Sequence, residues 1–503
     1  MVKIKLLVII LAILSVVSVL NASNIIYVDA SSPNDPGSGT IEDPFRKIQN
    51  AINYAAAGDT VKIRPSIYSG PGNYNLDPAG KAITISSTNP EDAEVVANTV
   101  IDPNKAGRGF YFHSGEDANC IISGLTIRNA YTGGKGGGVF CYNSSPTIIN
   151  CVITGNSAGT HGGGFFFQLS NAAVIGCVIT SNTAVLDGGG LECWSGNAVI
   201  TNCIISNNNA LYGNGGGVDC FHYGNTTVKN CTLVKNSSNF GGGLYCLGSE
   251  VTFTNNIVWA NDANQGSQIG LESYAEMISS LPITYSDVQG GSTLVYDPCG
   301  LLVWGKSNLD IDPCFASFNP EGDPNLWDFH LKSIAGRWNS TFYRIDLNNN
   351  GAINLIEFAR IANVWMQQDN MPEDLDNSGT VDWTDLELFA QYYLANSIED
   401  GWVTDSSTSP CVDAGDPNSD WTGEPWPNGK RINMGAYGGT NQASMSGNPA
   451  DFNIDGLVNF VDFAEFASHW KTNENCIEDL NLDSIVGYED LCIFTGNWLW
   501  QKK

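Results

Sequence analysis

A glycine triplet recurs five times along the middle of this chain. The triplets begin at Gly136, Gly162, Gly188, Gly215 and Gly241, and each is followed by a short, mostly apolar run. The period is therefore 26 or 27 residues. A fixed period in this range is typical of solenoids, in which a repeat buries its apolar face only by stacking on its neighbours. The triplets thus predict a domain of stacked repeats.

Each repeat also contains two strand-like segments and a recurring asparagine. The second segment is rich in β-branched residues, as in TIINCVIT at 147–154. The asparagine follows this segment at Asn156, Asn182, Asn208, Asn236 and Asn261. Stacked asparagine side chains can hydrogen-bond to the rungs above and below, and asparagine tolerates a left-handed turn. These features predict an all-β domain, a right-handed parallel β-helix (solenoid) over residues 23–338.

A solenoid has open ends that must be covered. Upstream of the triplets, the segment DPFRKIQNAINYAAAGDTV places apolar residues on one helical face. These residues are Phe45, Ile48, Ala51, Ile52 and Ala55. We therefore expect an N-terminal cap helix over the first rung.

These residues carry a family resemblance. Residues 25 to about 300, with the cap helix and the GDTV strand, resemble the pectin-lyase-like right-handed β-helix proteins. The glycine-triplet rungs also resemble the repeats of polymorphic outer-membrane proteins. Residues 328–338 and 409–440 resemble the C-terminal closing segment of secreted bacterial β-helix proteins. The resemblance implies the fold but no single chemistry, because the family includes lyases, glycosidases and non-enzymatic surface proteins.

The N-terminus and the charge limit where the protein works and what it binds. Residues 1–22 combine Lys3 and Lys5, an apolar run from Leu6 to Leu20 and small residues near Ala22, which predicts a signal peptide and a secreted or cell-surface protein. A membrane anchor is the alternative, although fifteen apolar residues are short for a span. The net charge of −29 argues against nucleic acid as a partner.

Most of the fourteen cysteines recur with the repeat. The recurring positions are Cys141, Cys193, Cys220 and Cys246 in one series, and Cys151, Cys177, Cys203 and Cys231 in the other. We expect reduced thiols that stack as small hydrophobic groups, although rungs about 4.8 Å apart lie within disulfide reach. Cys314 with Cys411, and Cys476 with Cys492, are the better disulfide candidates because they lie outside the ladder.

Four acidic twelve-residue segments fit a calcium-binding loop. They span 346–357, 374–385, 451–462 and 479–490, and a helix-forming segment follows each. The loop pattern requires oxygen ligands at alternate positions, a glycine at position 6 and a carboxylate at position 12. The fourth loop departs from the pattern, because Ser484 replaces the glycine and Gly487 removes one ligand. The candidate Ca²⁺ ligands are Asp346, Asn348, Asn350, Ala352, Asn354 and Glu357; Asp374, Asp376, Ser378, Thr380, Asp382 and Asp385; Asp451, Asn453, Asp455, Leu457, Asn459 and Asp462; and Asp479, Asn481, Asp483, Ile485 and Asp490.

Two such loops about 28 residues apart resemble the dockerin type I module, over residues 342–396 and again over 449–500. The resemblance implies a cohesin-like protein partner, chosen through loop positions 10 and 11. Here those positions are mostly apolar or aromatic, as at Leu355, Trp383 and Phe460, rather than the small polar pairs often seen. This departure puts standard cohesin docking in question.

The first loop pair interrupts the closing segment, which fixes the expected domain order. That order is a signal peptide at 1–22, the β-helix at 23–338, an inserted dockerin-like pair at 341–400, the closing segment at 401–446 and a second dockerin-like pair at 447–503. We expect the inserted pair to dock within the molecule on the open end of the β-helix. Only the second pair is placed to reach an outside, cohesin-like partner freely.

One face of the solenoid carries candidate functional residues. Side chains alternate along a strand, so Glu192 and Trp194 point outward if Leu191 and Cys193 point inward. The candidate catalytic residues on this face are Glu192, Asp219 and Asp187. The candidate glycan-binding residues are Phe140, Tyr142, Phe166, Trp194, Phe221 and Tyr245. Sugar rings stack on aromatic faces, and paired carboxylates can hydrolyse a glycosidic bond.

Several functions remain open for this face. A surface that binds extracellular polysaccharide without cleaving it is the first interpretation. A glycoside hydrolase is the second, because carboxyl groups on adjacent rungs approach the spacing of about 5 Å that retaining enzymes use. A polysaccharide lyase is a further alternative, but the family's lyases use Lys or Arg beside an acidic sugar, and this face offers none in the sequence pattern. A purely structural surface is the last.

Overall fold

The computed structural model describes most of the chain. It covers residues 23–339 except 323, 325 and 326, and residues 402–446 except 404, 426, 427 and 430. Between these two parts it describes 345, 347, 353, 355–367, 373, 375, 380, 381 and 383–392. In the C-terminal part it describes 450, 457–471, 485–496 and 498. The predicted signal peptide lies outside the described residues.

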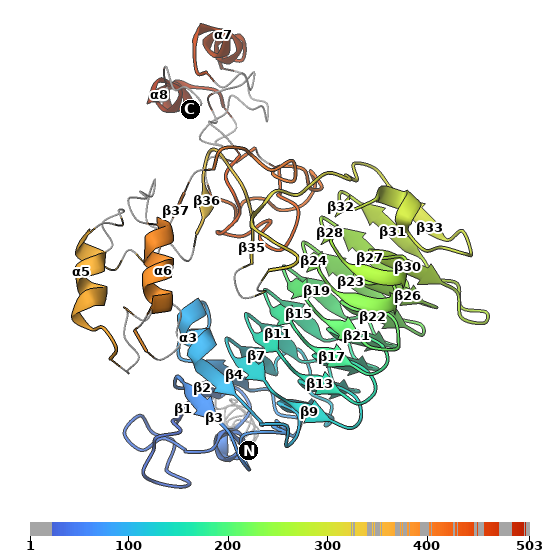
Figure 1. Cartoon of the computed structure of the whole chain (residues 1–503), viewed down its shortest axis with the longest axis vertical. Helices are drawn as coiled ribbons and strands as arrows, with labels where there is room; N and C mark the ends of the chain where they lie inside the picture. The colour runs from blue at the N-terminus through green and yellow to red at the C-terminus, as the bar shows by residue number, and fades with distance from the viewer. Residues whose placement is uncertain are drawn as a thin grey trace, which may run out of the picture.

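The chain forms a parallel β-helix, as predicted, in which successive rungs stack along one axis (Figure 1). Sheet A consists, in order, of β1 (Ile25–Val28), β2 (Thr60–Ile63), β4 (Thr84–Ser87), β7 (Ile121–Ser123), β11 (Thr147–Ile149), β15 (Ala173–Ile175), β19 (Val199–Thr201), β23 (Asn225–Lys229), β27 (Glu250–Thr254), β31 (Leu281–Thr284) and β33 (Leu302–Trp304). Sheet B consists of β3 (Ser66–Tyr68), β5 (Thr99–Ile101), β8 (Thr126–Arg128), β12 (Val152–Thr154), β16 (Val178–Thr180), β20 (Ile204–Ser206), β24 (Thr232–Val234), β28 (Ile257–Trp259) and β32 (Asp287–Val288).

Two further sheets complete the rungs. Sheet C consists of β6 (Phe110–Phe112), β10 (Val139–Tyr142), β14 (Phe165–Gln168), β18 (Leu191–Trp194), β22 (Val218–Phe221), β26 (Leu244–Leu247) and β30 (Ile269–Glu272). Sheet D consists of β9 (Tyr131–Thr132), β13 (Ser157–Ala158), β17 (Thr183–Ala184), β21 (Asn209–Ala210), β25 (Ser237–Phe240) and β29 (Asp262–Gln265). Sheets A, B and C surround one core of Val, Ile, Leu, Phe and Cys side chains.

The asparagine ladder is confirmed. Asn182 Nδ2 donates to Ile153 O at 2.8 Å and to Asn208 Oδ1 at 3.0 Å, and Asn182 N also donates to Asn208 Oδ1 at 3.0 Å. The same pattern repeats at Asn156, Asn208 and Asn236. Each buried amide thus satisfies backbone groups of two rungs, which fixes the register between them.

The recurring cysteines are buried free thiols, as expected for small hydrophobic groups in the core. Cys314 and Cys411 are also free, so the structure does not contain the disulfide expected between them. The Cys411 thiol instead donates to Asp287 Oδ2 at 3.2 Å. Cys476 lies outside the described residues, so its expected pairing with Cys492 remains a prediction.

At both ends of the solenoid, apolar side chains from outside the rungs pack against the core. At the N-terminal end, helix α2 (Ile48–Tyr54) buries Ile48, Ala51 and Ile52 in the core. A second short helix, α3 (Ala93–Asn98), precedes β5. At the C-terminal end, after the 3-10 helix η1 (Gly291–Leu294), residues such as Leu301 and Trp304 pack against the core.

The chain at 315–338 and 402–446 lies on the outer side of sheet B. It contributes β34 (Phe315–Ser317), paired antiparallel with β35 (Asp328–Leu331), followed by β36 (Arg337–Trp338) and β37 (Trp402–Val403). Cys411 and Met434 share one apolar cluster with Val234 of β24 and Ile257 of β28. Asn202 Nδ2 donates to Ala436 O at 3.0 Å, so asparagines at the solenoid corners also hold this segment.

The inserted segment begins and ends at one neck, because β36 and β37 pair with each other. Beyond this neck lie α5 (Leu355–Asn363) and α6 (Trp383–Tyr392), and the C-terminal part contains α7 (Phe460–Ser468) and α8 (Tyr488–Gly496) (Figure 1). Val403 of the neck packs against the α5–α6 core. None of the helices in the described part of the chain is long and apolar enough to cross a bilayer.

Candidate functional site

Sheet C presents the candidate residues on its outer face in two columns. The first column contains Phe140, Phe166, Glu192, Asp219 and Tyr245, and the second contains Tyr142, Gln168, Trp194, Phe221 and Leu247. Register pairing makes the members of each column neighbours, as predicted. The alternate residues, such as Leu191 and Cys193, join the core.

The two columns differ in exposure. Glu192 and Asp219 are only 1% and 4% exposed, and Phe166 and Tyr245 are buried as well. In the second column Tyr142 is exposed, and Trp194 and Phe221 are partly exposed. The alternation of the sequence therefore predicts the direction of the first column but not its burial.

The first glycine of each triplet explains this burial. Gly188 has a φ of +66°, and a Cβ on it would lie 2.5 Å from Glu192 Cβ. Gly215 approaches Asp219 in the same way, at 2.7 Å. Only glycine allows such an approach with this backbone. The chain just before each triplet thus folds onto the first column and carries Lys135, His161 and Asp187 with it.

An ionisable cluster forms where this chain covers the column, with Glu192 and Asp219 buried and His161 and Asp187 partly buried. His161 Nδ1 lies 3.0 Å from Glu192 Oε2 and 3.4 Å from Asp187 Oδ2. Asp219 is the register partner of Glu192 on the next rung. The structure therefore brings together all three candidate catalytic residues and adds His161, which in the sequence stands directly before a glycine triplet.

Burial and mutual charge set the protonation of this cluster. Burial lowers the pKa of His161, but its contacts with Asp187 and Glu192 outweigh this effect and raise the pKa to about 9. Burial raises the pKa of Glu192 to about 7, although His161 acts in the opposite direction. Burial, together with the charges of Glu192 and Asp187, raises the pKa of Asp219 well above its usual range.

The expectation that this face has no Lys or Arg is wrong. Lys135 Nζ lies 4.1 Å from the Trp194 ring centroid and 4.6 Å from that of Phe166. The Arg108 guanidinium lies 5.4 Å from the ring centroid of Phe140. These side chains come from turns outside the strands, so alternation within the strands cannot reveal them. Both cations cover aromatic rings in cation–π contacts.

Sequence reasoning missed two aromatic residues beside the second column, Tyr223 and Tyr274, and noted His222 only for its closeness to Asp219. The Tyr274 and His222 rings contact Phe221, at 5.3 Å and 5.5 Å between centroids, and the Tyr223 ring contacts His222 at 5.0 Å. A signal was present in the repeat length. Val199 follows Trp194 by five positions, but its register partner Thr227 follows Phe221 by six, so this corner has one additional residue.

The candidate calcium loops are described only in part. The carboxylates at loop position 12 are Glu357, Asp385, Asp462 and Asp490, and all four are fully buried. Each is the third residue of its helix, from α5 to α8. The apolar residues at position 8, namely Ile353, Val381, Val458 and Val486, are likewise fully buried. Of the other candidate ligands, Thr380, Leu457, Asn459 and Ile485 are described, and the rest lie outside the described residues.

These buried carboxylates occupy the positions that the calcium-loop pattern requires for its last ligand. A carboxylate in a protein core requires compensation by charge or hydrogen bonds. Leu375 N donates to Asp385 Oδ1 at 2.5 Å, and Gly487 N donates to Asp490 Oδ2 at 2.7 Å. In the second module, Asn459 caps α7 and its N–H donates to Asp462 Oδ2 at 2.9 Å. Backbone donors thus hold these carboxylates at the loop ends, where position 12 ligates calcium.

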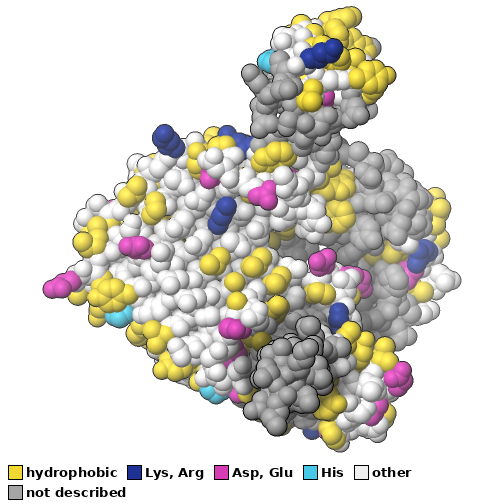
Figure 2. Space-filling model, turned by 180° about the vertical axis from the view of Figure 1, so that it is seen from behind, with side chains coloured by type: hydrophobic (Ala, Val, Ile, Leu, Met, Phe, Trp, Pro, Cys, Tyr) yellow, Lys and Arg dark blue, Asp and Glu magenta, His cyan; other side chains and the backbone are white. Residues whose placement is uncertain are grey.

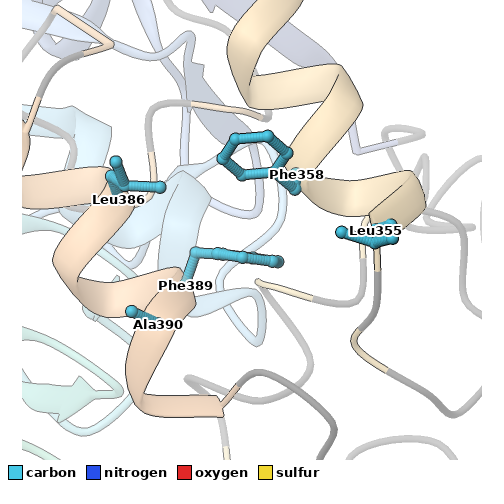
Figure 3. Close-up of a pocket in the computed structure, with 5 residues that line it drawn as sticks. All are labelled: Leu355, Phe358, Leu386, Phe389 and Ala390. Atoms are coloured by element: carbon cyan, nitrogen blue, oxygen red, sulfur yellow. The ribbon is translucent and has the colours of Figure 1, made fainter.

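A shallow apolar groove lies between α5 and α6 (Figure 3). It is lined by Leu355, Phe358, Leu386, Phe389 and Ala390. Leu355 occupies loop position 10, and the residues at this position in the other loops, Trp383, Phe460 and Tyr488, are also exposed. The two modules therefore share an exposed apolar residue at the start of each helix.

A comparison with known families supports the fold of the repeats. The family described as "Right handed beta helix region" matches residues 137–316. Among solved structures, the chain is similar to the pectate lyase Pel9A, with a TM-score of 0.34, 15% identity, and coverage of 83% of this chain and 97% of that chain. It is also similar to a rhamnogalacturonan lyase, with a TM-score of 0.27, 13% identity, and coverage of 60% and 94%. A search of curated proteins gave no match. The matched family region includes every candidate residue on the sheet C face.

Proposed function

We propose that this protein is a secreted or cell-surface β-helix that binds polysaccharide on the outer face of sheet C without cleaving it. One observation carries the proposal: the aromatic second column reaches the surface, whereas the carboxylates of the first column are buried. Aromatic side chains with polar edges suit sugar rings, which present apolar faces and hydroxyl groups. On the face seen in Figure 2, the Lys and Arg side chains of the described residues are scattered rather than gathered in one patch.

A glycoside hydrolase is the second candidate, and the Glu192 pKa of about 7 favours it, because a general acid has to stay protonated near neutral pH. The argument against a hydrolase is that a substrate cannot reach the candidate carboxyl groups. A catalytic carboxyl group must lie within hydrogen-bond reach of the glycosidic oxygen, but Glu192 and Asp219 are buried. The turns before the triplets, two of which carry Lys135 and His161, fold over this face. Binding without cleavage therefore accounts for more of the geometry.

The helical modules contribute a second part of the proposed function. We propose that each module binds Ca²⁺ through its two loops, with Glu357 and Asp385 closing the loops of the first module and Asp462 and Asp490 those of the second. The ion supplies the positive charge that balances these buried carboxylates. The module at 447–503 then offers its exposed residues, including Phe460 and Tyr488, to a cohesin-like protein, whereas the module at 341–400 docks within the molecule.

A retention assay tests the binding function. The calcium-loaded protein is passed over immobilised neutral and acidic polysaccharides, and the reaction mixtures are analysed for new reducing ends and for unsaturated products. We expect retention without either product. A double variant with Tyr142→Ala and Trp194→Ala should bind about tenfold more weakly, because each ring contributes about 0.5–1.5 kcal/mol.

The controls separate binding from catalysis. Glu192→Gln should keep its affinity, since this buried side chain does not reach the ligand. Tyr54→Ala removes an exposed ring near the N-terminal end and should not change retention. Reducing ends that vanish in Glu192→Gln would establish a hydrolase, and unsaturated product would establish a lyase. Absence of retention on every polysaccharide would contradict the proposal.

A further inference from the structure

Four aromatic side chains form an exposed patch at one corner of the solenoid. We call Phe221, His222, Tyr223 and Tyr274 the corner patch. Tyr223 is 71% exposed and Tyr274 is 46% exposed. Phe221 lies at the end of β22, and Tyr274 follows β30, two rungs away (Figure 1). Rings from two rungs thus converge on one surface.

The rings of the patch stand at steep angles to one another. The Phe221 and Tyr274 rings are inclined by 76°, and the His222 and Tyr223 rings by 81°, with centroids 5.3 Å and 5.0 Å apart. Trp194 meets Phe221 at 74° on the neighbouring side. Such edge-to-face contacts hold the rings without stacking them flat. The exposed faces therefore remain available to a flat apolar surface from outside.

The backbone at this corner is strained. His222 and Tyr223 have φ values of 66° and 56°, both in the left-handed region. A non-glycine residue in this region costs about 1 kcal/mol or more, and the cost has to be offset by surrounding contacts. The N–H groups of His222 and Tyr223 donate to Leu247 O and Gly248 O at 3.1 Å and 2.8 Å. These bonds hold in place the additional residue that presents the Tyr223 ring.

The hydrogen bonds of Ser195 show which nitrogen of His222 can accept a hydrogen bond from a ligand. Ser195 Oγ lies 2.6 Å from His222 O and 2.9 Å from His222 Nδ1. A carbonyl oxygen only accepts, so the Ser195 hydroxyl donates to it and accepts from Nδ1–H. This leaves His222 Nε2 as a hydrogen-bond acceptor for a ligand, and it also means that Ser195 is not activated as a nucleophile.

The charges near the corner patch favour a neutral sugar over an anionic one. In the described part of the chain, no Lys or Arg lies over a ring of the corner patch, whereas Lys135 covers Trp194. The exposed acid Glu276 is two residues from Tyr274, and the chain as a whole carries a net charge of −29. A carboxylated or sulfated sugar would be repelled at this corner.

We infer that the corner patch is a subsite for one neutral hexopyranose unit of the bound polysaccharide. The inference rests on the proposed binding function and gives it a location and a ligand class. The apolar face of the sugar stacks on Tyr223 or Tyr274, and a hydroxyl group donates to His222 Nε2. The two tyrosine hydroxyls supply further polar contacts at the rim.

The test compares two double variants of the full-length, calcium-loaded protein. Tyr223→Ala with Tyr274→Ala removes the exposed rings of the patch. Tyr212→Ala with Tyr131→Ala is the matched control, because these tyrosines are 74% and 45% exposed and lie elsewhere on the solenoid. Affinities are measured for a soluble neutral glucan, a neutral galactan and polygalacturonate. We expect a loss of about tenfold or more for a neutral glycan in the first variant only.

Other outcomes overturn the inference and are distinguishable from failure of the binding function. Unchanged affinity in the patch variant, with weaker binding after Tyr142→Ala and Trp194→Ala, would keep the binding face but exclude the subsite. Preference for polygalacturonate would exclude the neutral ligand. Weaker self-association of the patch variant in sedimentation, with unchanged glycan binding, would assign the patch to a second copy of the chain. If the wild-type protein binds none of the glycans, the proposed function fails as well.

Discussion

The solenoid and the helical modules both bury carboxylates, but they compensate these groups differently. In the solenoid, Glu192 pairs with His161 Nδ1 at 3.0 Å, and burial favours the protonated form of Asp219. In the modules, the position-12 carboxylates lie at the start of helices, within loops whose sequence pattern suits calcium. A proton and a histidine are thus expected to compensate one region, and a metal ion the other.

The difference follows from the size of the two cores. The solenoid has a continuous apolar core that runs from Ile26 to Val288. The second module has a small described core, consisting of Ala450, Val458, Phe466, Val486 and Phe494. Small domains bury too little apolar surface to be stable without additional links such as metal ions. Metal removal should therefore affect the modules, and pH should affect the solenoid.

Calcium removal should have the largest effect. A ligand present at 1,000 times its Kd stabilises a folded domain by about 4 kcal/mol per site. Chelation should therefore unfold both modules and leave the solenoid folded. Differential scanning calorimetry with and without chelator measures this, and limited proteolysis locates the opened segments. A single transition that does not move on chelation would remove the distinction between the two regions.

Loss of one position-12 carboxylate should act on one module only. Glu357→Gln keeps the size of the side chain but removes a charge, so we expect at least about tenfold weaker calcium binding in the first module. Asp462→Asn is the matched variant for the second module. Isothermal titration calorimetry should show weaker calcium binding in the first module for Glu357→Gln and in the second module for Asp462→Asn. If either variant abolishes binding in both modules, the modules are not independent.

The repeat made the solenoid predictable from sequence, because rungs of one length put equivalent residues in register. The glycine triplets, the asparagine ladder and the outward columns follow from this periodicity. The burial of Glu192 does not, because it depends on a turn that folds back across the face. His161 and Lys135 stand at equivalent positions before the triplets, yet nothing in the period shows that their side chains reach the next rungs. The turn that presents His222 and Tyr223 in the corner patch contains a single additional residue, which interrupts the period, and Tyr274 comes from a loop outside it.

Raising the pH should destabilise the solenoid through Asp219. A carboxyl group whose pKa is raised on folding contributes stability at low pH, and this contribution is lost as pH rises through the folded pKa. Asp219→Asn removes the ionisable group, so the slope of the unfolding free energy against pH should become less negative by up to about 1.4 kcal/mol per pH unit. This change is expected between the pKa of Asp in the unfolded chain, about 3.9, and the folded pKa of Asp219. Urea denaturation from pH 5 to 9 measures this, and Asp262→Asn, at an exposed position in sheet D, is the control. An unchanged slope would mean that Asp219 is ionised throughout.

The smallest expected effect is a shift in the pKa of one histidine, His161. The pKa of His161 is raised to about 9, so its contribution to stability is complete below about 6.5 and is lost as pH rises through about 9. Glu192→Gln removes one of its two carboxylate partners and leaves Asp187. The pKa of His161 should then fall by about one unit or more, since desolvation opposes the charge. NMR titration of the five histidines measures it, with His161→Asn to assign the signal. A pKa that stays near 9 would show that Asp187 alone holds the proton on His161, and that the solenoid leaves Glu192 protonated rather than paired.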